Sequence, residues 1–139
     1  MVSTGFLTDL IANDLQASIF HGASFPAFPT NLYLALSRVN PNRQNAIPAP
    51  FTELTGSNYS RTLIACTSGN WTLNATGQAY NTLQITLPVP TAPWLTVFGW
   101  GLYDAPTGGT LWWCGNLPGL VFTTTSAPII AAGALILQI

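Results

Sequence analysis

Thr30-Asn31-Leu32-Tyr33-Leu34-Ala35-Leu36-Ser37 is the stretch that shows the periodicity of this 139-residue chain most clearly. Leu32, Leu34 and Leu36 recur at every second position, with other side chains between them. Because neighbouring residues of a strand point to opposite faces, the three leucines fall on one face. The stretch therefore predicts a β-strand with a buried face, in a sheet that covers an apolar core.

Further strands are predicted after this stretch, between breaks rich in Pro and Gly. They cover residues 60–66, 70–74, 82–87, 95–103, 110–114, 119–123 and 133–139. Their spacing is typical of a β-sandwich. Residues 39–58 are rich in Pro and Asn and predict a long loop, and loops of that length usually have a function or lie at an interface.

The region before the stretch has a different period. Apolar residues recur there at spacings of three and four from Phe6 to Ile19, and Ser3 and Thr4 offer an N-cap. This pattern predicts one amphipathic helix over residues 3–21, ending near Gly22. We expect residues 1–139 to form a single all-β domain, an antiparallel β-sandwich or jelly roll with one N-terminal helix.

Charged residues are unusually rare in this chain. It has three Lys or Arg and four Asp or Glu, so 5% of its residues are charged, against about a quarter in ordinary domains. A soluble monomer depends on a charged surface, so we expect other copies or other proteins to cover much of this one. Nucleic-acid binding and membrane-surface attraction both require clustered basic residues, and three scattered arginines exclude both.

Residues that could carry catalysis are few and scattered. His21 is the one histidine, and it is expected at the helix end, where the helix dipole favours it. The chain has no G-x-S-x-G nucleophile motif, and its Cys, His and acidic residues show none of the usual metal-ligand spacings. We therefore expect no enzymatic activity, no metal and no cofactor.

Cys66 and Cys114 are expected to be two buried, small apolar side chains, as free cysteines often are. A disulfide between them stays open, since nothing in the sequence indicates an oxidising compartment.

The five tryptophans allow two interpretations. Adjacent strand residues face opposite ways, so we expect Trp100 and one of Trp112 and Trp113 in the core, and the other facing outward in a protein interface. The alternative is a platform on which sugar rings stack, as in a carbohydrate-binding module.

Several motifs follow one another in a recognisable order. T-N-L-Y-L-A-L at 30–36 is followed by E-x-x-x-x-x-Y-x-R at 53–61, T-S-G-N-W at 67–71, F-G-W-G-L-Y at 98–103 and T-L-W-W-C-G at 110–115. In this order the motifs resemble a family of small tailed-phage structural proteins, often labelled tail-fibre-like. The chain departs from that family at Ser37, where a His is usual, and in the 39–58 loop, which lacks acidic and Gly-rich character.

The resemblance implies a virion protein and carries over no catalytic residues. Small β proteins of this kind are similar to head decoration, or cement, proteins, which commonly form trimers on assembled capsids. We therefore expect a homotrimer that binds the major capsid protein on the outer surface of the capsid. The alternative is a tail-fibre or baseplate component that binds host surface carbohydrate through exposed tryptophans.

Large apolar contacts suit such an assembly, because exposed ion pairs contribute little and are screened by salt. We expect the N-terminal helix and the 39–58 loop to make contacts outside the sandwich. The candidate interface residues are Phe25, Phe28, Arg43, Phe51 and Trp94. Arg61 is expected instead to form a structural ion pair with Glu53.

Overall fold

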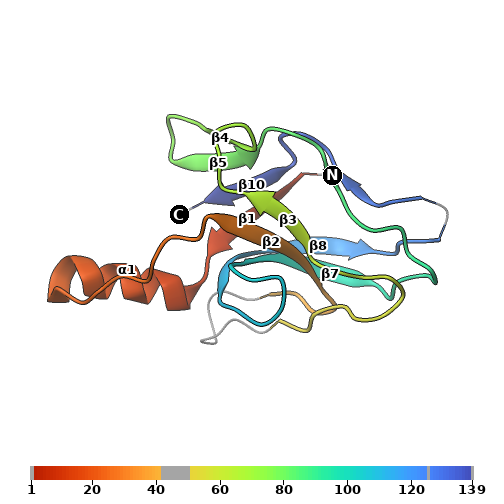
Figure 1. Cartoon of the computed structure of the whole chain (residues 1–139), viewed down its shortest axis with the longest axis horizontal. Coiled ribbons are helices and arrows are strands. Elements are labelled where there is room, and N and C mark those ends of the chain that lie inside the picture. Colours follow the sequence, from red (N-terminus) through yellow and green to blue (C-terminus); the bar gives the residue numbers. More distant parts are fainter. Residues whose placement is uncertain (1, 42–50, 125, 139) are drawn as a thin grey trace.

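Strands dominate the computed structural model of the chain, which describes residues 2–41, 51–124 and 126–138 (Figure 1). The elements are β1 (Ser3–Leu7), α1 (Asp9–His21), β2 (Asn31–Ser37), β3 (Thr62–Ala65), β4 (Trp71–Leu73), β5 (Gln78–Asn81), β6 (Ile85–Thr86), β7 (Val97–Tyr103), β8 (Leu111–Leu120), β9 (Ile129–Ile130) and β10 (Leu135–Gln138). The prediction of an all-β, sandwich-like fold with one N-terminal helix is confirmed.

Eight of the described strands form one curled sheet, in the order β3-β2-β7-β8-β1-β10-β5-β4. Neighbours in this sheet are antiparallel except β1 and β10, which run parallel with Ser3 opposite Leu135. The other two described strands, β6 and β9, pair with Ile85 opposite Ile130. Both of these isoleucines are buried in the main core, so the small sheet packs over the large one as a second layer.

The core lies on the face that the leucines of β2 present. Leu32, Leu34 and Leu36 are all buried, together with Trp100 of β7. Ser37 is also buried, because Glu53, inside the predicted 39–58 loop, forms an antiparallel bridge with it. The period of two therefore identified the inner face correctly, while the second half of β2 is covered on both faces.

The N-terminal helix begins at Asp9, so the prediction of a helix from residue 3 is wrong for its first turn and a half. These residues form β1 instead, between β8 and β10. A Cβ at Gly5 would overlap the Trp100 ring, so glycine allows the two to pack closely. The Ser3 hydroxyl accepts a hydrogen bond from Trp100 Nε1 at 2.7 Å. These partners lie far away in sequence, and a local apolar spacing does not register them.

Both ends of α1 have identifiable causes. At its start, Thr8 donates from its hydroxyl to the Leu111 carbonyl at 2.7 Å, which ties the helix to β8. At its end, Gly22 adopts the left-handed conformation with φ 67°, and the Ala23 N–H reaches back to the Ala17 carbonyl at 3.2 Å. The predicted helix end is confirmed, in the form of a glycine C-cap.

Two predicted strands are divided differently in the structure. The 82–87 prediction retains only β6, because Asn81 ends β5 with a turn in which its side-chain amide donates to the Leu83 carbonyl at 2.8 Å. The 119–123 prediction is not a separate strand, because β8 continues to Leu120. Pro118 does not break β8, since it lies where the pairing register with β7 shifts.

Candidate functional site

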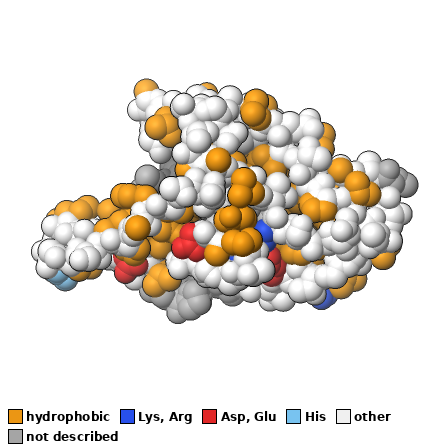
Figure 2. Space-filling model, viewed as in Figure 1, with side chains coloured by type: hydrophobic (Ala, Val, Ile, Leu, Met, Phe, Trp, Pro, Cys, Tyr) orange, Lys and Arg blue, Asp and Glu red, His pale blue; other side chains and the backbone are white. Residues whose placement is uncertain are grey.

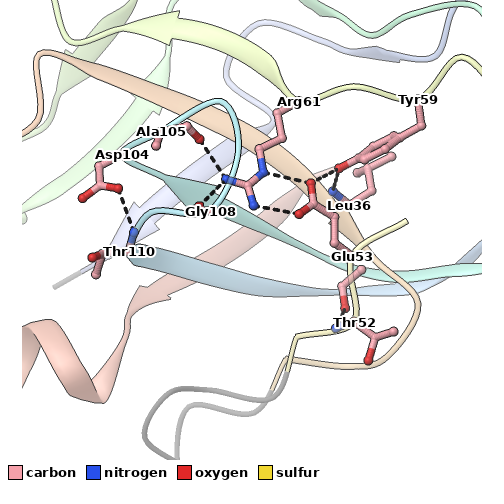
Figure 3. Close-up of polar contacts among 10 residues, drawn as sticks. Leu36, Thr52, Glu53, Tyr59, Arg61, Asp104, Ala105, Gly108 and Thr110 are labelled. Carbon is pink, nitrogen blue, oxygen red and sulfur yellow. Dashed lines mark hydrogen bonds and ion pairs between the residues drawn. The ribbon is translucent and has the colours of Figure 1, made fainter. Parts of the chain in front are cut away.

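A polar cluster joins residues 53–61, at the end of the predicted loop and just after it, to the β7–β8 turn (Figure 3). Arg61 donates from Nε and Nη2 to the two carboxylate oxygens of Glu53, at 2.8 and 2.7 Å. The Tyr59 hydroxyl donates to Glu53 Oε1 at 3.0 Å and accepts from the Leu36 N–H at 2.9 Å. We name Glu53, Tyr59 and Arg61 the clasp. The predicted ion pair between Glu53 and Arg61 is confirmed.

Arg61 uses its remaining donors inside the molecule. Its Nη1 donates to the carbonyls of Ala105 and Gly108, both at 2.8 Å, and its guanidinium carbon lies 3.7 Å from the centre of the Tyr103 ring. The side chain is only 6% exposed. Since bidentate pairing and ring stacking are the strongest contacts an arginine makes, the clasp is a structural device that holds a loop against a turn.

The clasp also determines the protonation of its tyrosine. Burial raises the pKa of Tyr59 well above its ordinary value, and the nearby Glu53 carboxylate acts in the same direction. The hydrogen bond that Arg61 donates to Glu53 raises the pKa of Arg61. Tyr59 is therefore a stable hydrogen-bond donor at neutral pH, and its environment does not prepare it to act as an acid or a base.

The prediction that Trp94 lies in an interface is wrong, because Trp94 is 2% exposed and belongs to the core. Its indole N–H donates to the Ser57 carbonyl at 3.0 Å. Its ring packs edge-on against Tyr59 and Phe122, with centroids 5.6 and 5.8 Å apart. The Pro-rich sequence around Trp94 resembles an exposed loop, but this loop is covered by the segments it crosses.

The other candidate interface residues do not form one patch. Phe51 is half-buried and packs edge-on against Tyr103, with centroids 5.5 Å apart. Arg43 lies outside the described residues, as do residues 42–50 of the predicted 39–58 loop. Phe25 and Phe28 lie together beside the helix, with centroids 5.0 Å apart. Phe28 is 75% exposed, and it is therefore the candidate that best fits the prediction.

The helix and the segment that returns from it project beyond the sheet (Figure 1). We name α1 together with residues 22–29 the arm. Along one stripe of the helix, Ile11 is 1% exposed, Leu15 is half-buried and Ile19 is 64% exposed. The apolar stripe thus continues past the edge of its own sheet, and its outer end is exposed in the single chain.

Aromatic residues reinforce the base of the arm and cover its outer part. At the base, the Trp112 ring lies 6.1 Å from Phe25 and 6.3 Å from Phe28, centroid to centroid. Farther out, Phe20 is 76% exposed. Figure 2 shows hydrophobic side chains along the projecting arm. The base therefore anchors the arm to β8, and the outer part presents apolar surface to solvent.

A wide groove of about 820 Å³ lies where the two edges of the curled sheet approach each other. β3 and β4 are at opposite ends of the strand order, yet residues 66–68 after β3 and residues 71–73 of β4 both line this groove. We name it the edge groove. Its lining consists of Leu32, Cys66, Thr67, Ser68, Trp71, Thr72, Leu73, Asn74, Gly77, Gln78, Ala79, Trp113 and Leu137.

The tryptophans are divided between the core and the groove. Trp100 and Trp112 are buried, as predicted for Trp100 and one of the pair. Trp113 does not face openly outward: it is half-buried and lines the edge groove with Trp71. The indole nitrogens of Trp71 and Trp113 are buried without a hydrogen-bond partner in the described chain. All five tryptophans are described and none is exposed, so the predicted platform of exposed rings is absent.

The cysteines differ from each other. Cys114 is buried, as expected, and Cys66 is exposed, which corrects the prediction for it. No disulfide joins the two cysteines in this structure, which answers the question that the sequence left open. Cys66 escapes burial because it directly follows the last residue of β3, at the rim of the edge groove.

Two kinds of feature are absent from the part of the chain that the structure describes. Across residues 2–41, 51–124 and 126–138, no three His, Cys, Asp or Glu side chains lie close enough together to hold a metal ion. Within the same residues, no helix has the length and apolar character needed to cross a bilayer.

Sequence reasoning missed the edge groove. The sequence singles out Trp71 and Trp113, but the groove lining comes from six strands or their ends. The groove forms only when the sheet curls and brings its edges together. A local pattern contains no signal for that closure.

Comparison with known proteins supplies the family. A protein-family model described as "Podophage GP4 fiber I protein gp80" matches residues 7–138. No curated protein matches the chain. The family match spans both the arm and the sandwich, and it confirms the resemblance drawn from the order of the motifs. The chain belongs to the Podophage GP4 fiber I protein gp80 family and is a structural protein of a tailed-phage virion.

Proposed function

We propose that this chain is a non-enzymatic subunit of a fibre on the phage virion, and that its arm secures it there. The description of its family as a fibre protein supports a fibre over the capsid surface. The observation that carries the proposal is the arm, whose apolar stripe continues beyond its own sheet to Ile19.

The energetics of the arm favour a permanent contact. Burying a large apolar side chain contributes about 1.5–3 kcal/mol relative to leaving it in water. In the single chain most of this stabilisation is not realised by the three exposed side chains of the arm. They are Ile19, Phe20 and Phe28, which are 64%, 76% and 75% exposed. Several large, exposed apolar side chains on one projecting segment favour an interaction site. A contact built from it is insensitive to salt, which suits a particle that must persist outside the cell.

The engagement of the acidic side chains supports a role without catalysis. Glu53 is held by Arg61 and Tyr59. Asp104 accepts from the Thr110 N–H at 2.7 Å and from Trp112 Nε1 at 3.2 Å. Both carboxylates therefore stabilise turns and loops of the fold.

Head decoration is the second candidate, and the low charge of the chain favours it. Three basic and four acidic residues suit a protein that binds many identical capsid sites through apolar contacts. In that function a homotrimer would bind the major capsid protein on the outer surface of the head.

Gold labelling of intact virions with an antibody against the folded chain tests the proposal. We expect label on fibres, and pre-adsorption of the antibody with purified protein should abolish it. Label distributed over the head would overturn the fibre assignment and establish decoration instead.

A further inference from the structure

We propose that the arm of one copy occupies the edge groove of a second copy of this chain. The inference rests on the proposed function, in which many copies assemble in one virion. It links two surfaces of the same molecule that are each left open in the single chain.

The edge groove is suited to an apolar occupant. Its volume of about 820 Å³ lies within the roughly 300–1,000 Å³ of typical ligand pockets. None of its lining residues is charged. Leu73, at its rim on β4, is 78% exposed. An apolar guest would cover this leucine together with the half-buried faces of Trp71 and Trp113.

The polar side chains of the groove argue against a sugar. The Asn74 side-chain amide donates to Gln78 Oε1 at 3.0 Å, and its Oδ1 accepts from the Gln78 N–H at 2.9 Å and the Thr76 N–H at 3.0 Å. These groups stabilise the β4–β5 turn. Sugar recognition needs several polar groups that converge on the ligand, and the two amide side chains of the groove are committed to each other and to the turn. The indole N–H groups of Trp71 and Trp113 remain as donors without a partner in the described chain.

The arm has the form and chemistry of such a guest. An amphipathic helix that lays its apolar face into a groove is a recurrent mode of recognition. The outer end of α1 presents Ile19 and Phe20, which are 64% and 76% exposed. His21 is the one ionisable residue next to them. Little charge would therefore have to be desolvated on either surface, which removes the main cost of burying polar interfaces.

The area involved matches a specific interface. Large side chains bury about 150–250 Å² each, so the exposed parts of Ile19, Phe20 and Phe28 amount to roughly 400 Å². Each copy gives one arm and receives another, so each would bury roughly 800 Å², the share per partner in a standard-size complex. Reciprocal exchange between two copies places both arms and both grooves in one interface and satisfies this condition, whereas a closed ring would divide the same area between two interfaces.

Light scattering on the full chain and two variants tests the proposal. Ile19→Ser/Phe20→Ser removes the apolar end of the arm, and Leu73→Arg places a charge in the groove. We expect an oligomer for the wild type, and for each variant a dissociation constant raised about tenfold or more. Leu63→Arg is the matched control, because Leu63 is 54% exposed and does not line the groove. Thermal unfolding checks that all variants fold.

Mixing the two variants distinguishes this contact from others. The arm variant retains its groove and the groove variant retains its arm, so an equal mixture should form a heterodimer that neither forms alone. An arm-to-arm contact would instead leave Leu73→Arg fully assembled. That result, or a monomeric wild type, would overturn the inference.

The exposed thiol at the groove rim gives a second readout. In the Ile19→Cys variant, mild oxidation should link the introduced thiol of one copy to the native Cys66 of another. Ile19→Cys/Cys66→Ser should lose that linkage, which peptide mass spectrometry identifies. Absence of the linkage in an assembled Ile19→Cys sample would contradict the inference. Gold label on fibres together with a monomeric wild type would leave the proposed function standing and reject only the arm-in-groove contact.

Discussion

The clasp and the arm lie on the same chain and use their side chains in opposite ways. In the clasp, Arg61 is 6% exposed and directs its hydrogen bonds to groups within the chain. In the arm, Phe20 is 76% exposed. A region whose interactions close on themselves stabilises the fold, whereas a region whose apolar surface stays open is available to a partner. The predictions below test this division by comparing stability with assembly.

The largest expected effect is on the core beside the clasp. Trp94→Ala should lower the free energy of unfolding by about 3–5 kcal/mol, because it removes a buried ring and leaves a cavity. Urea unfolding measures this. Leu95→Ala is the control, since Leu95 is 56% exposed and should change stability by at most about 0.5 kcal/mol. If Trp94→Ala left stability unchanged but abolished assembly, Trp94 would have to be assigned to an interface after all.

The clasp itself comes next. Arg61→Met should lower the free energy of unfolding by about 2–3 kcal/mol. Breaking a fully buried ion pair costs about 3–5 kcal/mol, and the effect is smaller here because the Glu53 side chain is 27% exposed. The exposed Arg38 gives the matched control, Arg38→Met, with an effect of at most about 0.5 kcal/mol. In a double-mutant cycle with Glu53→Gln, the two losses should be less than additive. Additive losses would mean that the pair does not couple.

Tyr59→Phe should cost about 1–2 kcal/mol at neutral pH, since two hydrogen bonds are lost. The pKa of Tyr59 is raised in the folded state from an ordinary value of 10.0. Its contribution is therefore complete below pH 10 and is lost as pH rises above that value, by about 1.4 kcal/mol per unit. Unfolding measured across this range should show the wild type losing stability faster than Tyr59→Phe. Parallel pH profiles would disprove the buried, protonated phenol.

The smallest effect on stability is expected in the arm. Phe20→Ser should change the free energy of unfolding by at most about 0.5 kcal/mol, because the side chain is mostly in water. It should nevertheless reduce incorporation into virions, measured as protein per purified particle. Val121→Ser is the control, at a side chain that is 63% exposed on the sandwich. A loss of stability above about 1 kcal/mol would show that Phe20 belongs to the fold.

Sequence reasoning was reliable where the cause was local or chemically unambiguous. Glu53 and Arg61 are opposite charges in a chain with few others, so their pairing was predictable before the geometry was known. Trp94 was misplaced, because its exposure depends on Tyr59 and Phe122, which lie far from it in sequence. Low charge predicted that surface would be covered, but it did not indicate which surface.

By itself, the sequence determined the inner face of β2, the glycine end of α1, the all-β class and the family. The face and the helix end follow from patterns among neighbouring residues, and the class and the family follow from the order of strands and motifs along the chain. The tertiary structure alone decided that residues 3–7 form β1, since Ser3 bonds to Trp100 across the sheet. It also decided that α1 extends beyond its sheet and that Leu32, Trp113 and Leu137, from three distant strands, line one groove with the β3–β4 connection. Such features depend on contacts between distant segments, and hydrophobic periodicity records only which residues prefer burial.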